Sequence, residues 1–117
     1  AKVSEIEVEL KALEMTQMRV VAAEGKRRDN KPDPASSILK IKGSEIQQNI
    51  TNLLMEVVGP FALPFVDEDD AGSKEIPVAP DYAGPLAPIY FNYRKVSIYG
   101  GSNEIQKNII AKAILGL

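Results

Sequence analysis

The sequence contains neither cysteine nor histidine. Without cysteine, the chain can form no disulfide and has no thiolate for nucleophilic catalysis or for a zinc site. Without histidine, it also lacks the imidazole that often serves as a general base or as a metal ligand near neutral pH. The formal net charge is −2, so bulk electrostatics gives no reason to expect nucleic-acid binding.

Long apolar runs are also missing. No stretch approaches the roughly 20 apolar residues that a membrane-spanning helix needs, so we expect no membrane span. The first residues, Ala1 to Glu5, lack the charged-then-apolar pattern of a secretory signal, and we expect a cytoplasmic protein. The chain has 117 residues, 44% hydrophobic and 26% charged, which suits one small globular domain over residues 1–117.

Apolar residues recur at steps of three and four, the spacing of amphipathic helices, and almost no strand pattern is present. Asp33 followed by Pro34 suits an N-cap and a first helical position, while Gly25 and Gly59 are typical of helix ends. Gly43 lies inside the second helix, where glycine usually allows a neighbouring backbone to come close. The predicted helices cover residues 3–24, 34–58, 88–97 and 102–115.

The segment 60–85 differs in composition from the predicted helices. Proline, glycine and the acidic run Asp67–Asp70 dominate it, and a loop of this length is often functional or mobile. The acidic run lacks the ligand spacing of an EF-hand, so we expect a solvated loop and no metal site. The basic trio Lys26–Arg28 is interpreted as a solvated helix end, with phosphate binding the less favoured alternative. The predicted fold is all-α, an antiparallel up-and-down bundle of three to four helices with a long Pro/Gly/acidic loop.

The segment from Tyr99 to Glu104, YGGSNE, is the strongest candidate site. Its adjacent glycines, Gly100 and Gly101, permit positive φ and close approach of another molecule to the backbone. Ser102 suits an N-cap, and the first amides of the following helix can bind an anion or the polar edge of a cofactor. Glu104 could instead accept a hydrogen bond from a ribose or a ring edge. On spacing alone, the favoured interpretation is a tight helix–helix corner that needs glycine for its geometry.

The C-terminal stretch IYGGSNEIQKNIIAKAILGL, residues 98–117, resembles the C-terminal signature of the acyl-CoA dehydrogenase family. Residues 7–24, EVELKALEMTQMRVVAAE, and 36–59, SSILKIKGSEIQQNITNLLMEVVG, resemble two central helices of that family's C-terminal helical domain. The resemblance implies part of a FAD-dependent enzyme of fatty acid metabolism that oxidises acyl-CoA to 2-enoyl-CoA. It also implies that the first helix of this domain and the other two domains lie outside the sequence.

The resemblance also implies roles for single residues. It implies FAD contacts at Ser102, Asn103 and Glu104 and a substrate contact at Gly101. In some branches of the family the catalytic glutamate stands at the position of Gly100, and glycine offers no base. Other carboxylates are candidate bases by residue type alone, namely Glu14, Glu45, Glu56 and Glu75. Because no pattern singles one out, we name no catalytic residue. The sequence also departs from the family pattern at Phe91-Asn92, where many members have Arg-Asp, and at Gly59-Pro60-Phe61.

Three hypotheses follow. The first is the C-terminal part of an acyl-CoA dehydrogenase, which contributes FAD contacts and a subunit interface in a homo-oligomer. Its implied partners are acyl-CoA and an electron-transfer flavoprotein or similar acceptor, and we expect the isolated chain to be inactive. The second is a helical protein-interaction module without a catalytic role. The third is the base-lacking subunit of a two-chain dehydrogenase.

Overall fold

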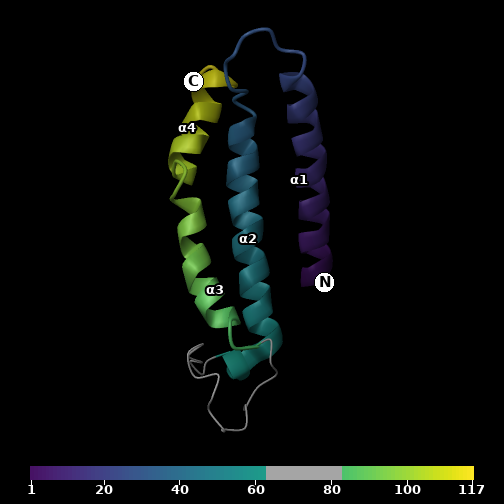
Figure 1. Cartoon of the computed structure of the whole chain (residues 1–117), viewed down its shortest axis with the longest axis vertical. Coiled ribbons are helices and arrows are strands. Elements are labelled where there is room, and N and C mark those ends of the chain that lie inside the picture. The colour runs from purple at the N-terminus through teal and green to yellow at the C-terminus, as the bar shows by residue number, and fades with distance from the viewer. Residues whose placement is uncertain (63–82) are drawn as a thin grey trace.

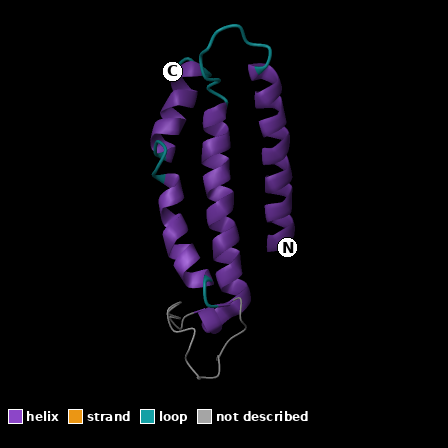
Figure 2. Ribbon diagram, viewed as in Figure 1, coloured by secondary structure: helices purple, strands orange, loops and turns teal. Residues whose placement is uncertain are grey.

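The computed structural model describes residues 1–62 and 83–117, and in these ranges the chain is helical. Two 3₁₀ segments, η1 (Gly59–Ala62) and η4 (Tyr93–Ser97), continue α2 and α3. The four α-helices are α1 (Lys2–Glu24), α2 (Ser36–Val58), α3 (Leu86–Asn92) and α4 (Asn103–Ala113). No strand occurs in the described ranges, and the predicted all-α class is confirmed (Figure 2). Most of the predicted loop, including the acidic run, lies outside them.

The central element is α2 (Figure 1). Helix α1 packs antiparallel along one side of it, while α3, η4 and α4 follow one another along the other side. The described helices thus form a row with α2 in the middle. Because α2 contacts every other helix, its side chains decide where η4 and α4 lie.

The helix ends follow capping chemistry. The side chain of Asp33 accepts a hydrogen bond from the amide of Ala35 at 2.9 Å, and its carbonyl accepts from the amide of Ser36 at 2.9 Å. Asp33 therefore caps the entry turn as predicted, but α2 proper begins at Ser36 and not at Pro34. At its other end, α2 stops at Gly59, whose φ is 61°. Such a conformation is readily adopted only by glycine.

Two predicted boundaries were wrong. The third helix begins at Leu86, before Pro88, because a proline in the first helical turn gives up no hydrogen bond. It also changes to the tighter 3₁₀ form at Tyr93. The last helix ends at Ala113, since Gly116, with φ 72°, turns the chain back so that the amide of Leu117 bonds the carbonyl of Ala111 at 2.9 Å.

The buried core is small. Within residues 1–62 and 83–117, a buried cluster joins Val58 with Ala83 and Leu86, and Met55 packs against it where α2 meets the start of α3. Elsewhere the buried apolar residues are Val20, Ile41, Ile46 and Val96. Val20 is the one buried residue of α1; in the apolar stripe predicted for that helix, Ile6 and Leu13 are half-buried, and Val3 and Leu10 are exposed.

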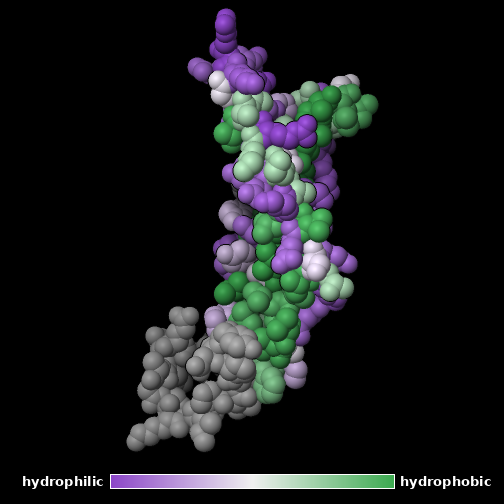
Figure 3. Space-filling view, turned by 90° about the vertical axis from the view of Figure 1, so that its right-hand side faces the viewer, coloured by the Kyte–Doolittle hydropathy of each residue, from purple (hydrophilic) through white to green (hydrophobic). Residues whose placement is uncertain are grey.

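The two open sides of the α1–α2 pair differ in polarity. One carries a groove of about 250 Å³ lined by Lys2, Glu5, Ile6, Glu9, Asn49, Asn52, Leu53 and Glu56. Helical periodicity turns Leu54 and Val57 away from this groove, and they are 39% and 67% exposed. Leu10 and Val21 of α1 are 50% and 59% exposed. Figure 3 shows apolar side chains gathered along the lower half of the face on the α1 side.

Candidate functional site at the turn into α4

The turn between η4 and α4 contains the two adjacent glycines. Gly100 and Gly101 have φ of 69° and 85°, a region that residues with side chains rarely adopt. A Cβ at Gly100 would meet no heavy atom within 4 Å, whereas one at Gly101 would lie 2.6 Å from Nε2 of Gln106. That same Nε2 donates to the carbonyl oxygen of Gly100 at 3.4 Å. Conformation therefore favours glycine at both positions, and crowding adds to the requirement at Gly101.

Ser102 and Glu104 lie at the start of α4. The Ser102 hydroxyl accepts a hydrogen bond from the amide of Ile105 at 3.4 Å, so the predicted N-cap is confirmed. The pKa of Glu104 is lowered, first by a hydrogen bond from its own backbone amide and then by the Ser102 hydroxyl. The positive charges of Lys107 and Lys40 lower this pKa further. Glu104 is fully exposed, so its carboxylate is ionised at neutral pH and open to another molecule.

Asn103 turns the other way, towards α2. Its side chain is buried, with 9% of the residue exposed. Its Oδ1 accepts from Nζ of Lys40 at 2.8 Å, and its Nδ2 donates to Oγ of Ser44 at 3.1 Å. The Ser44 hydroxyl in turn donates to the carbonyl oxygen of Ile41 at 2.8 Å. The structure thus brings Asn103 together with α2 and separates its side chain from the outward-facing Ser102 and Glu104.

A second polar cluster holds η4, the segment just before the turn. Nε2 of Gln48 donates at 3.3 Å to the carbonyl oxygens of Tyr93 and Arg94. In return, one guanidinium nitrogen of Arg94 donates to the Gln48 carbonyl at 3.2 Å and to the Thr51 hydroxyl at 3.3 Å. The guanidinium also lies over the Tyr90 ring, 4.3 Å from its centre, as in a cation–π contact.

Sequence reasoning missed the α2 members of both clusters. The available signal was the spacing of Ser37, Ser44 and Thr51, three small hydroxyl residues seven positions apart on a helix. All three are buried, at 4%, 5% and 6% exposure. A polar residue repeated with the heptad period of a buried helix face indicates a polar contact with a neighbouring helix.

The other candidate carboxylates lie on the surface. Glu14, Glu45 and Glu56 pair with Lys11, Lys42 and Lys2 at 2.9, 3.1 and 2.8 Å. Each of these carboxylates belongs to a solvated pair, which is the ordinary role of an exposed acid. Glu75 lies outside the described residues. Within the described part of the chain, no group of three or more acidic residues is arranged to hold a metal ion.

The face of α4 beside the turn is open. Gly100, Gly101 and Glu104 are exposed, and Ile105 is 55% exposed. Of the apolar face predicted for α4, Ile105 and Ile109 are exposed and Ile110 is half-buried, whereas the side chain of Asn103 contacts α2. The turn offers a hydroxyl, a carboxylate and glycine backbone to a molecule outside the bundle, and residue 100 offers no base.

Comparisons with known proteins indicate the family of the chain. The family model described as acyl-CoA dehydrogenase, C-terminal domain, matches residues 1–115. Among curated proteins, the chain is 33% identical over 82 residues to a protein of Mycobacterium tuberculosis (strain ATCC 25618 / H37Rv) named acyl-CoA dehydrogenase IpdE1. That match covers 69% of this chain but only 18% of the relative. No solved structure matches the chain.

None of the helices in the described ranges combines the length and the apolar character needed to cross a bilayer.

Proposed function

The chain belongs to the acyl-CoA dehydrogenase family, matching its C-terminal domain along almost the whole length, and we propose that it is the helical part of a FAD-dependent enzyme of this kind. The full enzyme would oxidise an acyl-CoA to a 2-enoyl-CoA and pass the electrons to an electron-transfer flavoprotein or similar acceptor, in the cytoplasm. Because the chain spans less than a fifth of the relative's length, these activities are proposed for the protein that contains it.

The open turn into α4 carries this proposal. Ser102 and Glu104 would contact FAD with their side chains, and Asn103 with its backbone amide, since its side chain is engaged with α2. Amides in the first turn of a helix suit anionic or polar edges of a ligand. Gly101 would lie beside the acyl-CoA, where a backbone without a Cβ allows close approach. When bound, FAD would accept the hydride, and these residues would hold and orient it.

The residues at the turn fit a binding role better than a proton-transfer role. Glu104 has a lowered pKa, so at neutral pH it accepts hydrogen bonds but is a weak base. Gly100, with φ 69°, adopts a conformation that a glutamate would take only with strain. Neither Gly100 nor Glu104 is therefore proposed as the base that removes the substrate proton.

A subunit interface is the second proposed contribution. Exposed apolar side chains extend over the α1–α2 pair, and Phe91 of α3 is 69% exposed. A bundle that buries so little apolar surface gains stability when another apolar surface covers it. We therefore expect the chain to form a homo-oligomer, in which symmetric copies cover these faces.

Two other functions were considered from the sequence. In a helical interaction module, the Gly-Gly-Ser turn would have a structural role only. This function would be favoured if the face from Ser102 to Gln106 were buried in the bundle. Ile105 is instead 55% exposed, which favours the cofactor site. A base-lacking subunit of a two-chain dehydrogenase is compatible with Gly100. It predicts that activity appears only when a second, different chain is added.

The proposal is tested by titrating FAD, with calorimetry and flavin fluorescence, into the dehydrogenase that contains this chain and into the chain alone. We expect weak or no binding to the chain alone. In the full enzyme, Ser102→Ala or Glu104→Ala should weaken FAD binding about tenfold, the loss expected for one charge-assisted hydrogen bond. Lys112→Ala, in the last turn of the same helix, is the matched control and should leave the affinity unchanged. Wild-type affinity in both turn variants would refute the proposed site.

A further inference from the structure

The polar contacts between α2 and the segment around the turn are unusual for so small a core. Ser44, Thr51 and Asn103 are among its most buried residues, with 5%, 6% and 9% exposed. Burying polar groups stabilises a helix contact only when their hydrogen bonds are all satisfied. In the described part of the chain, no fully buried side-chain nitrogen or oxygen lacks a partner. The contact is therefore a complete polar network with a defined geometry, which an apolar contact would not impose.

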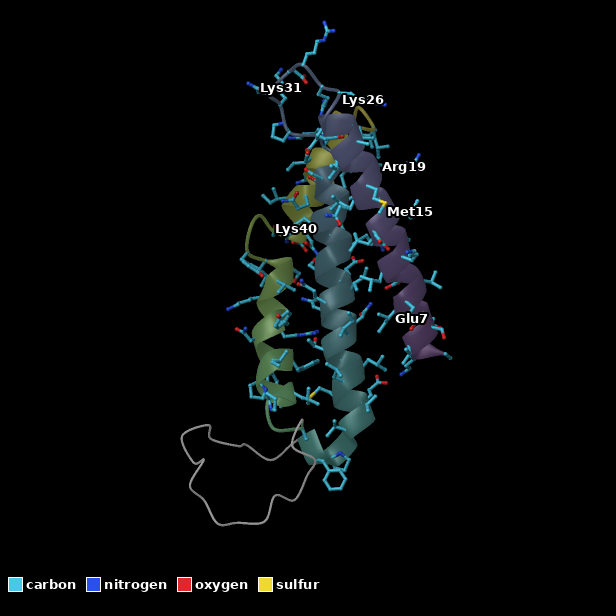
Figure 4. All side chains as sticks on the ribbon, turned by 45° about the vertical axis from the view of Figure 1, so that its right-hand side comes forward. Glu7, Met15, Arg19, Lys26, Lys31 and Lys40 are labelled. Atoms are coloured by element: carbon cyan, nitrogen blue, oxygen red, sulfur yellow. The ribbon has the colours of Figure 1, made fainter. Side chains whose placement is uncertain are left out.

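The first part of this network fixes the start of α4. Asn103 is the first residue of that helix, and its amide group uses both ends. The oxygen accepts from the Lys40 ammonium and the nitrogen donates to Ser44. The Ser44 hydroxyl gives its own proton to Ile41, so it can act as an acceptor for Asn103. Figure 4 shows Lys40 on α2 beside the loop that leads into α4. These bonds set both the position and the rotation of the first turn of α4.

The second part fixes the other side of the turn. Gln48 and Arg94 exchange hydrogen bonds, so η4 is attached to α2 by side chains from both segments. The chain from Ile98 to Ser102 thus connects two segments that are both fastened to α2. The two α2 anchors, Ser44 and Gln48, are one helical turn apart.

We propose that Asn103 is a positioning residue: held by Lys40 and Ser44, its side chain sets where Ser102 and Glu104 stand for the cofactor and does not itself touch the cofactor. This inference rests on the proposed function, because it concerns the same FAD contacts. It assigns Lys40 and Ser44 to the site although neither contacts the ligand. The family resemblance implies a FAD contact at Asn103; the proposal limits that contact to the backbone amide and gives the side chain the role of placing its two neighbours.

A double-mutant cycle on the FAD-loaded dehydrogenase tests this, with the dissociation constant of FAD as the measurement. Asn103→Ala and Lys40→Met should each weaken FAD binding by about tenfold, and the double variant should be within twofold of either single variant. Non-additivity is expected because both changes release the same helix start. If Asn103→Ala weakens FAD binding by the same factor in the wild type and in the Lys40→Met variant, then Asn103 acts independently of Lys40, and the proposal is overturned.

Two further variants separate positioning from folding. Asn103→Asp removes the amide N–H but keeps an acceptor for Lys40 and for the Ser44 hydroxyl, which already lies 3.4 Å from Oδ1, so FAD affinity should be retained within about twofold. A large loss in this variant would mean that the side-chain N–H donates to the cofactor, against the proposal. Ile46→Val, at a buried apolar residue that takes no part in the hydrogen bonds of the network, should lower the unfolding temperature without changing the dissociation constant. If it changes the dissociation constant as much as Asn103→Ala does, the effect is general destabilisation and the proposal fails.

The outcomes also separate this inference from the proposed function. If Ser102→Ala and Glu104→Ala weaken FAD binding while Asn103→Ala does not, the cofactor site stands and the positioning role is wrong. If none of these variants changes FAD affinity, the proposed cofactor site is itself wrong.

Discussion

Gly43 offers the sharpest test of the packing around α2. It is the eighth residue of a 23-residue helix, and glycine inside a helix is less favourable than alanine because the unfolded chain loses more freedom. The sequence alone favours a neighbouring backbone as the reason for this glycine. In the structure, however, a Cβ at Gly43 would meet nothing within 4 Å. The prediction therefore changes sign: Gly43→Ala should stabilise the chain.

The magnitude follows from helix propensity alone, since no contact is made or lost. We expect the free energy of unfolding to rise by about 0.5–1 kcal/mol. For a chain of this size, that corresponds to an increase of about 2–5 °C in the unfolding temperature. Urea titration followed by circular dichroism should show a higher midpoint with an unchanged slope, because the surface exposed on unfolding stays the same.

Gly59→Ala is the matched control for Gly43→Ala. It adds the same methyl group, also with nothing within 4 Å, but at φ 61° and ψ −137°. This conformation strains any residue with a Cβ, so Gly59→Ala should destabilise the chain by about 1–3 kcal/mol. If Gly43→Ala is neutral or destabilising in a monomer verified by light scattering, the reasoning from open space is refuted. A loss of stability confined to concentrations at which the chain assembles would instead place a second chain against Gly43.

Three further predictions concern the core, the turn and acid stability. Ile46→Ala, at a residue 3% exposed, should lower the free energy of unfolding by about 2–5 kcal/mol in urea titrations. Gly101→Ala should destabilise the chain more than Gly100→Ala in the same assay, because both are strained by positive φ but only the first places a Cβ 2.6 Å from Gln106. The pKa of Glu104 in the folded chain is lowered from its ordinary value of 4.5, so the ionised carboxylate stabilises the fold at pH values above 4.5. This contribution is lost as the pH falls through the folded-state pKa. Glu104→Gln should therefore reduce stability at neutral pH and differ progressively less from the wild type on acidification, as followed by thermal unfolding.

Much of the fold could be predicted from the sequence because local chemistry determines it. The spacing of apolar residues places α1 and α2, and the caps at Asp33 and Ser102 are where their side chains imply. The errors have local causes too. The start of α3 was misplaced because Pro88 was read as the first helical residue, although proline is tolerated throughout the first turn.

The site could be predicted only in part, because half of it depends on contacts between distant segments. The glycine pair and the Ser102 cap are local features, and the sequence reveals them. The burial of Asn103 depends on Lys40 and Ser44, which lie about 60 positions earlier in the chain. The heptad spacing of Ser37, Ser44 and Thr51 indicates a polar contact of α2 but does not identify the partner residue, so a pattern of residue types could not separate the inward Asn103 from the outward Ser102 and Glu104.

The resemblance implies that some branches of the family carry a glutamate at the position of Gly100, and the attachment of the turn to α2 does not depend on such a side chain. The hydrogen bonds that fasten the turn come from Lys40, Ser44 and Gln48 of α2, and none involves a side chain at residue 100. Gly100 contributes only its carbonyl, which any residue could provide, and its positive φ. The hydrogen bonds that attach the turn to α2 are therefore independent of the side chain at residue 100, while the positive φ of this residue favours glycine. Glycine at this position keeps those hydrogen bonds and offers no group for proton transfer.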